Sequence, residues 1–248
     1  MISDLKKAAL SSLKGRWGLG AGASFLYYAI PSVAISIIAG PFFLLWSVWI
    51  TMMGPSFFVE YSITGEEEIN VVGLVFALVA YALLVVIMFI GSMAVQGIMN
   101  YGYYNVTFRL AKKESTTIDD LFEGFRKKNV FRSIKVGLLT GVYIFLWSLL
   151  LVIPGIIKSF SYSMAYYILL DNPEYTASEA IKKSREMMKG HKLDLFILCL
   201  SFIGWFILGV FTFGIAYFWI YPYYTTTVSY FYLNLVNKDK IAEEKPVI

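Results

Sequence analysis

The sequence predicts an all-α fold: a polytopic transmembrane helical bundle of about six spans, with amphipathic interfacial helices. Two observations lead to this class. Apolar residues make up 58% of the 248 residues and charged residues only 15%, whereas soluble domains average about half and about a quarter. Charges are also absent from four long runs, residues 17–59, 69–108, 136–157 and 195–237. Because a helix needs about 20 apolar residues to cross a bilayer, two of these runs are long enough for two crossings each.

Helices, and not barrel strands, are expected to span the membrane. A helix satisfies its own backbone hydrogen bonds in a solvent that offers none. Barrel strands alternate apolar and polar residues over about ten positions, whereas the stretch Val71–Met88 is apolar on every side. We therefore expect a single integral membrane domain over residues 1–248.

The first element is expected to be an amphipathic helix over residues 1–17, which carries four basic side chains. The apolar run that follows exceeds the core of about 7–15 residues found in a cleaved signal peptide. We therefore expect a retained first span. The single cysteine, Cys199, lies inside an apolar run, so no intrachain disulfide is possible.

The basic residues set the expected orientation, because short basic loops stay in the cytoplasm. Of the 21 Lys and Arg residues, all but Lys158 lie before residue 17, between residues 109 and 135, between residues 182 and 192, or after residue 237. The connection Glu60–Glu68 holds four acidic residues and no basic one. We expect both termini in the cytoplasm and the acidic turn Gly65–Glu68 outside.

This orientation makes each apolar stretch cross an even number of times, which predicts three hairpins. Reversals are expected at Pro154-Gly155 and at Thr212–Gly214, since proline removes a backbone donor and glycine permits a turn. Residues 40–59 carry Trp46 and Trp49 between two Gly-Pro pairs, which favours an interfacial or re-entrant helix. The expected spans lie near residues 18–39, 71–95, 136–153, 157–171, 195–212 and 215–235.

Two cytoplasmic segments, near residues 117–128 and 176–189, are expected to form amphipathic helices that lie along the membrane. In the first, apolar residues from Ile118 to Phe125 follow helical spacing. In the second, Thr176 and Glu179 have the spacing of a capping box. Basic residues flank both segments, which favours contact with the anionic inner-leaflet lipids of the bilayer.

Short motifs suggest an internal repeat. Leu13-Lys14-Gly15-Arg16 precedes the first span, and Met188-Lys189-Gly190-His191 precedes the fifth. Glu123-Gly124-Phe125-Arg126, before the third span, is a looser match. Three units, each an amphipathic helix followed by a membrane hairpin, would explain six spans. Since the matches are four residues long, chance similarity is the competing explanation.

Several strings carry a family resemblance. They are IPGI at residues 153–156, SYSMA at residues 161–165, and Asp171-Asn172-Pro173. LKGRWG at residues 13–18 and FEGF at residues 122–125 extend the similarity toward the N-terminus. Together they resemble a bacterial family of multi-pass membrane proteins, domain of unknown function 975. The resemblance implies a location in the bacterial cytoplasmic membrane, and it lends no reaction and no catalytic residues.

The sequence shows no constellation for catalysis, so we expect no enzyme, no cofactor and no bound metal. The only histidine, His191, lies in a basic loop without the clustered ligands that metal sites need. A Ser–His or Cys–His nucleophile would have to use His191 with Cys199 or Ser201, which lie in the next apolar helix. Glu66-Glu67-Glu68 is expected to be a solvated acidic turn.

One ionisable residue lies within an apolar run. Lys158 follows the break at Pro154 and Gly155, and a charge inside a membrane segment suggests function by default. The alternative is that Lys158 snorkels to the outer headgroups, and we expect this alternative because the hairpin turn is close by.

Polar and aromatic side chains supply the other candidates. Gln96 and Asn100 recur at helical spacing with Gly97, so a close helix contact is expected ahead of a polar pathway. Tyr221 and Pro222 lie well inside the last run, where the proline would kink the helix. A Tyr- and Thr-lined helix of this kind borders either a cavity for a lipid or peptide or a plain packing kink.

Three function classes follow. The first is a non-enzymatic membrane protein that binds a partner protein, peptide or lipid in envelope maintenance or protection. The second is a small transporter or channel with a polar path lined by Gln96, Asn100 and Lys158. The third, an intramembrane enzyme, lacks a nucleophile–base pair. The sequence favours the first class, with the lipid bilayer and a membrane protein or peptide as partners and no nucleic acid.

Overall fold

The structure, a computed structural model, describes residues 1–61 and 67–244, with side chains for residues 1–52 and 70–238. The chain divides into two compact units. The first contains residues 1–29 and 94–248, and the second contains residues 30–93. Part of the acidic turn at residues 65–68, which was expected to lie outside the cell, falls beyond the described residues.

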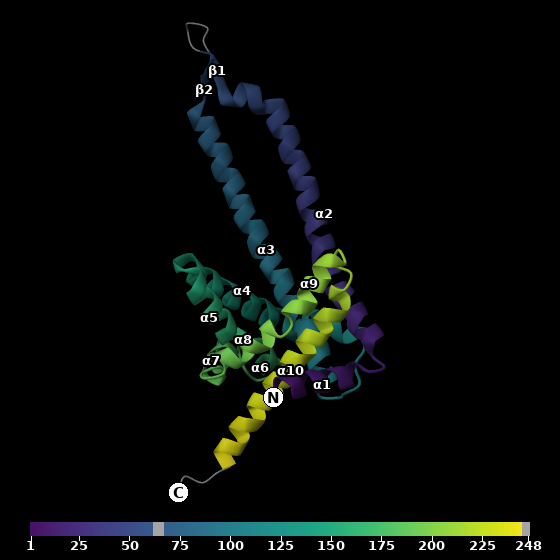
Figure 1. The fold of residues 1–248 in the computed structure, drawn as a ribbon. Helices are drawn as coiled ribbons and strands as arrows, with labels where there is room; N and C mark the ends of the chain where they lie inside the picture. Colours follow the sequence, from purple (N-terminus) through teal and green to yellow (C-terminus); the bar gives the residue numbers. More distant parts are fainter. Residues whose placement is uncertain (62–66, 245–248) are drawn as a thin grey trace. The chain divides into compact units, whose positions relative to one another are not determined.

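The second unit contains the later part of α2 (Trp17–Phe58), β1 (Val59–Tyr61), β2 (Glu67–Ile69) and the first part of α3 (Val71–Ala111) (Figure 1). The strands pair antiparallel, with Val59 opposite Ile69. Both helices expose aliphatic side chains along their length, such as Ile37 and Val72, as lipid-facing helices do. Residues 40–59 were expected to form a separate interfacial or re-entrant helix, but α2, of 42 residues, continues through them as far as Phe58.

The first unit contains the start of α2, the end of α3 and the remaining helices (Figure 1). Their bounds are α1 (Ile2–Leu13), the 3-10 helix η1 (Ile118–Phe125), α4 (Lys127–Leu150), α5 (Val152–Tyr162), α6 (Ala165–Asp171), α7 (Ala177–Met187), α8 (Lys192–Leu200), α9 (Ile203–Phe211) and α10 (Tyr217–Glu244).

Helices dominate the described chain, which confirms the all-α transmembrane class, but the number of spans differs from the expected six. Within the part of the chain that the structure describes, four segments are long and apolar enough to cross a membrane: Trp17–Met52, Val71–Ala111, Lys127–Leu150 and Lys192–Phe211. The expected span at residues 157–171 falls on α5 and α6, of 11 and 7 residues, and is not among these segments. The expected span at residues 215–235 lies in α10, where tyrosines and three successive threonines lower the hydropathy.

Three aromatic rings meet in the core of the first unit, one each from α3, α6 and α10. Phe108 lies 5.9 Å from Tyr167 and 5.6 Å from Tyr232, and the two tyrosine rings lie 5.6 Å apart, between ring centroids. Asp171, at the end of α6, also joins these helices, because it accepts from Lys112 Nζ at 2.7 Å and from the Tyr232 hydroxyl at 3.1 Å. The second arms of the three expected hairpins therefore converge.

The suggested repeat has a counterpart in backbone geometry. Gly15 follows α1 and Gly190 follows α7, and their φ angles are 78° and 81°, a region that favours glycine. In both places an amphipathic helix of similar length, 12 or 11 residues, leads through this glycine into an apolar helix. Gly124 in the looser match has no positive φ, so the third unit departs from this pattern.

Both amphipathic segments are helical. In η1, Leu121 is buried while Phe122 and Phe125 are exposed, whereas the apolar face of α7 meets protein. Glu179 and Thr176 form the expected capping box, with the Thr176 N–H donating to Glu179 Oε2 at 2.7 Å. The stripe of α7 is buried: Ala177, Ala180, Ile181, Ser184 and Met188. It packs on α4, α5 and α6, so the expectation that this face lies on the membrane is wrong.

Candidate functional site

The α4–α5 hairpin places Lys158 through a tighter turn than the sequence suggested. The chain reverses at Leu151, whose extended backbone (φ −161°, ψ 144°) separates the two helices. Pro154 lies in the first turn of α5, where the missing N–H would have had no helical partner. Gly155 does not make the reversal: a Cβ there would lie 2.9 Å from the Ser148 Cα. Its role is to let α5 approach α4 closely.

Lys158 is half-buried and stands against an aromatic ring. Its Nζ lies 4.3 Å from the centre of the Trp147 ring, within the distance of a cation–π contact. It also borders a cavity of about 370 Å³, which we name the basic cavity. The lining residues are Tyr143, Trp147, Lys158, Tyr162, Ser178, Ile181, Lys182 and Arg185.

Helical spacing brings these side chains to one place. Tyr143 and Trp147 are four residues apart on α4, and Lys158 and Tyr162 are four apart on α5, so each pair shares a helix face. On α7, Ser178 and Lys182 are four residues apart and Lys182 and Arg185 are three apart, which also places them on one helix face. The three helices therefore meet along one stripe each, and the aromatic rings of Tyr143 and Tyr162 lie 5.9 Å apart between them.

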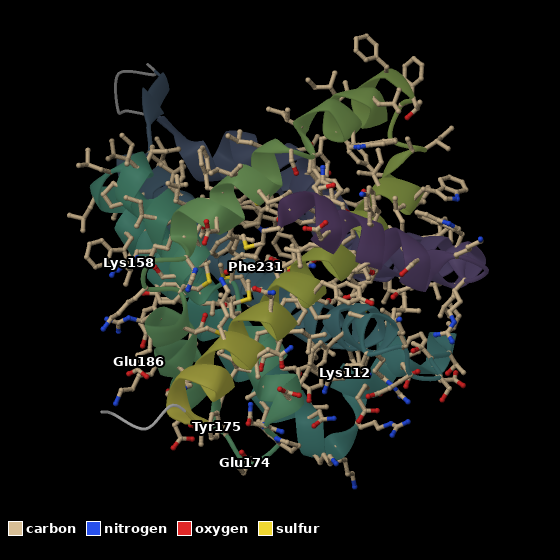
Figure 2. The ribbon with its side chains drawn as sticks, turned by 60° about the horizontal axis from the view of Figure 1, so that its bottom comes forward. Lys112, Lys158, Glu174, Tyr175, Glu186 and Phe231 are labelled. Atoms are coloured by element: carbon tan, nitrogen blue, oxygen red, sulfur yellow. The ribbon has the colours of Figure 1, made fainter. Side chains whose placement is uncertain are left out.

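The charges in the basic cavity are all positive. Among the side chains that the structure describes, no carboxylate forms an ion pair with Lys158, Lys182 or Arg185. Glu179, on the preceding turn of α7, is held by Thr176 at the N-terminus of that helix. Figure 2 shows Lys158 on α5 and Glu186 on α7 along one edge of the first unit, and Glu186 is not among the residues that line the cavity. An anion would therefore meet an unneutralised site here.

Gln96 and Asn100 take part in a hydrogen-bonded cluster with the start of α2. The Tyr27 hydroxyl donates to Asn100 Oδ1 at 2.6 Å, and Gln96 Nε2 donates to the Tyr27 oxygen at 2.6 Å. Tyr221 stacks on Tyr27, with ring centroids 5.4 Å apart. On the same stretch of α3, a Cβ at Gly97 would lie 2.8 Å from the Ser133 carbonyl oxygen of α4. This face packs closely against other helices, as the spacing indicated.

The structure does not bring the three proposed path residues together. Gln96 and Asn100 bond to each other and to Tyr27, whereas Lys158 borders the basic cavity, whose lining includes neither of them. A polar path that uses all three residues therefore has no support in the described contacts.

Pro222 lies inside α10 and packs near Gly20 of α2, whose added Cβ would lie 3.1 Å from the proline Cβ. One turn further, Thr225 Oγ1 donates to the Tyr221 carbonyl at 2.8 Å. This part of α10 borders a cavity of about 270 Å³, which we name the hydroxyl cavity. It is lined by Tyr104, Ser159, Phe160, Ser163, Tyr167, Leu195, Cys199, Tyr224, Thr225 and Val228.

A third cavity, of about 350 Å³, lies among the end of α3, η1 and the start of α4. Its basic side chains are largely neutralised within the protein. Arg109 meets Asp120 and lies 3.3 Å from Glu114, and Arg126 lies 3.0 Å from Glu123. Lys112, labelled in Figure 2, pairs with Asp171. These contacts indicate a network that holds helices together.

Residues with nucleophilic or ligand chemistry lie apart. His191 Nδ1 lies 3.0 Å from Asp194 Oδ2, so the histidine has a carboxylate neighbour that the sequence reading missed. Cys199 Sγ lies 3.3 Å from the Tyr224 hydroxyl, and the Ser201 hydroxyl donates to the Leu198 carbonyl at 2.6 Å. Within the described residues, no three His, Cys, Asp or Glu side chains gather as a metal site.

Sequence reasoning missed Lys182 and Arg185 as site residues, because it treated them only as markers of orientation. Their spacing with Ser178 on a capped helix was a usable signal. The link between α7 and α5, the helix that carries Lys158, is Ser184. Its hydroxyl donates to the Ser161 carbonyl at 2.8 Å and accepts from the Met164 N–H at 3.2 Å. This long-range contact has no local signature.

Comparison with known proteins finds a family match for the C-terminal part of the chain. Residues 148–239 match the family model described as "Protein of unknown function (DUF975)". No curated protein and no solved structure matches the chain. The matched segment holds α5 to α9 and most of α10, including Lys158, Lys182 and Arg185. Residues 148–239 are therefore similar to the DUF975 family, and over this segment the match confirms the resemblance seen in the sequence.

Proposed function

We propose that the protein is a non-enzymatic bacterial membrane protein that binds a lipid within its helical bundle and thereby supports envelope maintenance. The hydroxyl cavity carries this proposal. Apolar and aromatic groups form much of its wall, and the polar groups are Ser, Thr and Tyr hydroxyls and one thiol. Ligand sites commonly combine an apolar wall with a few placed polar groups. This lining suits an acyl chain that carries an ester or hydroxyl group.

The size of the hydroxyl cavity limits the ligand. Its volume of about 270 Å³ lies just below the range of about 300–1,000 Å³ typical of sites for drug-sized molecules. It therefore fits part of a lipid, such as one chain, while the rest stays in the bilayer.

We propose a location in the cytoplasmic membrane with both termini in the cytoplasm. The distribution of basic residues supports this orientation, and the basic cavity strengthens it. Lys158, the one basic residue that the sequence left outside the cytoplasmic groups, shares a cavity with Lys182 and Arg185. All 21 basic residues are then assigned to one side of the membrane.

The single cysteine offers a direct test, because Cys199 lines the hydroxyl cavity. The full-length protein would be purified with native lipid and alkylated with a small maleimide, before and after delipidation. We expect delipidation to speed alkylation of Cys199 and added lipid to slow it again. The matched control is Cys199→Ser with Ser36→Cys, on the exposed face of α2, whose alkylation should not change. Equal rates at Cys199 with and without lipid would contradict the proposal.

A further inference from the structure

We propose that the basic cavity binds the phosphate of an anionic phospholipid from the leaflet that faces the basic loops. The site is separate from the hydroxyl cavity, and the proposal stands whether or not that cavity holds a lipid. Three features of the structure carry it: the uncompensated charge, the fixed arrangement of the helices, and the apolar tip beyond the cavity.

The charge selects an anion. Lys158, Lys182 and Arg185 line the cavity together, and within the described side chains none of them has a carboxylate partner. Arginine and lysine donors are the groups that proteins use for phosphate recognition. Ser178, on the same stripe of α7, adds a hydroxyl to the lining. The third cavity of the first unit differs here, since Arg109, Lys112 and Arg126 already have acidic partners. Arg132, in the same cavity, donates to the backbone carbonyls of Asn172 and Tyr175.

The arrangement is fixed before a ligand arrives. Ser184, fully buried, bonds to both sides of the α5–α6 junction. It lies one residue before Arg185 and two after Lys182, so this contact holds the α7 cations opposite Lys158. Preformed sites lose less conformational entropy when a ligand binds.

The hairpin beyond the cavity is suited to acyl chains. Leu149, Leu150, Leu151, Val152 and Ile153 form its tip, and each is at least 67% exposed. Lys158 follows Leu151 by seven residues, which corresponds to about 10 Å of helix. A single leaflet contributes about 15 Å of hydrocarbon to a core of about 30 Å. With Lys158 at phosphate depth, the tip therefore ends inside that leaflet, and α4, although long and apolar enough to cross, does not span the bilayer.

The aromatic residues agree with this depth. Trp147 and Tyr143 border the cavity next to Lys158, and both are 38% exposed. Trp and Tyr are enriched at the level of lipid headgroups. From tip to base the hairpin is thus first aliphatic, and then Trp147, Lys158 and Tyr143 follow at a similar level, as in a segment that enters a membrane from one side.

The occupant is therefore a phospholipid rather than a soluble phosphate, because the aliphatic tip would have no role with a soluble ligand. The test uses the full-length protein in mild detergent, titrated with short-chain phosphatidylglycerol, with phosphatidylcholine of the same chains, and with glycerol 1-phosphate. Native mass spectrometry gives the apparent affinities.

We expect phosphatidylglycerol to bind about tenfold more tightly than phosphatidylcholine. Lys182→Gln should weaken phosphatidylglycerol binding by about fivefold, as should Lys158→Gln, the loss expected for one basic group near anionic lipid. Lys183→Gln is the matched control, since Lys183 is the exposed neighbour of Lys182 and does not line the cavity. Its affinity should equal that of the wild type.

Three results would overturn the proposal. Equal affinities for the two lipids would show that the cavity does not discriminate between an anionic and a zwitterionic headgroup. Equal effects of Lys182→Gln and Lys183→Gln would show that net charge of the helix, and not the cavity, attracts the lipid. Binding of glycerol 1-phosphate as tight as that of phosphatidylglycerol would make the ligand a soluble phosphate.

Discussion

The ammonium group of Lys158 lies 4.3 Å from the centre of the Trp147 indole ring. A lysine within an apolar hairpin thus has an aromatic partner where a carboxylate would be the more common choice. We predict that Trp147→Leu lowers the free energy of unfolding by about 0.5–1 kcal/mol, the range of a cation–π contact at an exposed site. Trp147→Tyr, which keeps an aromatic face, should lose less. Thermal unfolding in detergent measures both, and equal losses would argue against the contact.

The hydroxyl of Ser184 joins α7 to the α5–α6 junction. Ser184→Ala leaves the Met164 N–H and the Ser161 carbonyl without this partner in a buried place. An unsatisfied buried group costs about 1–3 kcal/mol, so we expect destabilisation in that range. The control is Ser11→Ala, at an exposed serine that bonds only to its own helix, which should change the free energy of unfolding little. Similar values for both variants would contradict the assigned role.

Gly97 on α3 lies where α4 crosses. An alanine Cβ there would come within 2.8 Å of the Ser133 carbonyl oxygen, so Gly97→Ala should cost about 1–3 kcal/mol through overpacking. Gly91, on the same helix, has open space at its Cβ position. Gly91→Ala should be neutral or stabilise by up to about 1 kcal/mol through helix propensity. Chemical denaturation of the two variants should therefore give opposite trends.

The capping box of α7 predicts a pH effect. Hydrogen bonds from the Thr176 N–H and hydroxyl hold the pKa of Glu179 below its ordinary value of 4.5. A lowered folded-state pKa contributes stability that is present above the unfolded pKa and is lost as the pH falls through the folded pKa. We expect the protection factors of amides in the first turn of α7, which correct for the intrinsic exchange rate at each pH, to fall below about pH 4.5. In Glu179→Gln this fall should disappear, and an unchanged pH profile of the protection factors would contradict the assignment.

The depth of the α4–α5 hairpin can be measured by thiol labelling. In a Cys199→Ser background, Leu151→Cys should resist a membrane-impermeant maleimide added outside intact cells, because the topology that we propose ends the tip within the cytoplasmic leaflet. Asn70→Cys, next to the acidic connection, should be labelled. Labelling of Leu151→Cys from outside would show that the hairpin crosses the membrane, and would restore the original expectation for this segment.

Composition and charge distribution were enough to predict a helical membrane protein. The capping box at Thr176 and Glu179 was also readable, because it depends on residues three positions apart. The number of spans could not be predicted from the sequence. Hydropathy measures how apolar a segment is. It does not show that side chains of α6 and α10, such as Tyr167 and Tyr232, are buried against other helices.

For the candidate residues too, the sequence predicted the individual positions but not the partners that they meet in the fold. Gln96 and Asn100 were found from helical spacing, and they do lie at a helix contact, but their partner Tyr27 is about 70 residues away in sequence. Lys158 was found because it interrupts an apolar run. Its association with Lys182 and Arg185 depends on how α7 packs against α5. This packing rests on contacts between distant segments, which local sequence patterns do not predict.

The most direct test of lipid binding is native mass spectrometry of the wild-type protein and of Ser163→Leu, which reduces the hydroxyl cavity, each released from mild detergent. We predict that the wild type retains a lipid of defined mass that Ser163→Leu loses, while Ser36→Leu, at an exposed position, retains it. A wild-type protein that emerges free of lipid, or a Ser163→Leu variant that keeps the same lipid in the same amount, would contradict the account.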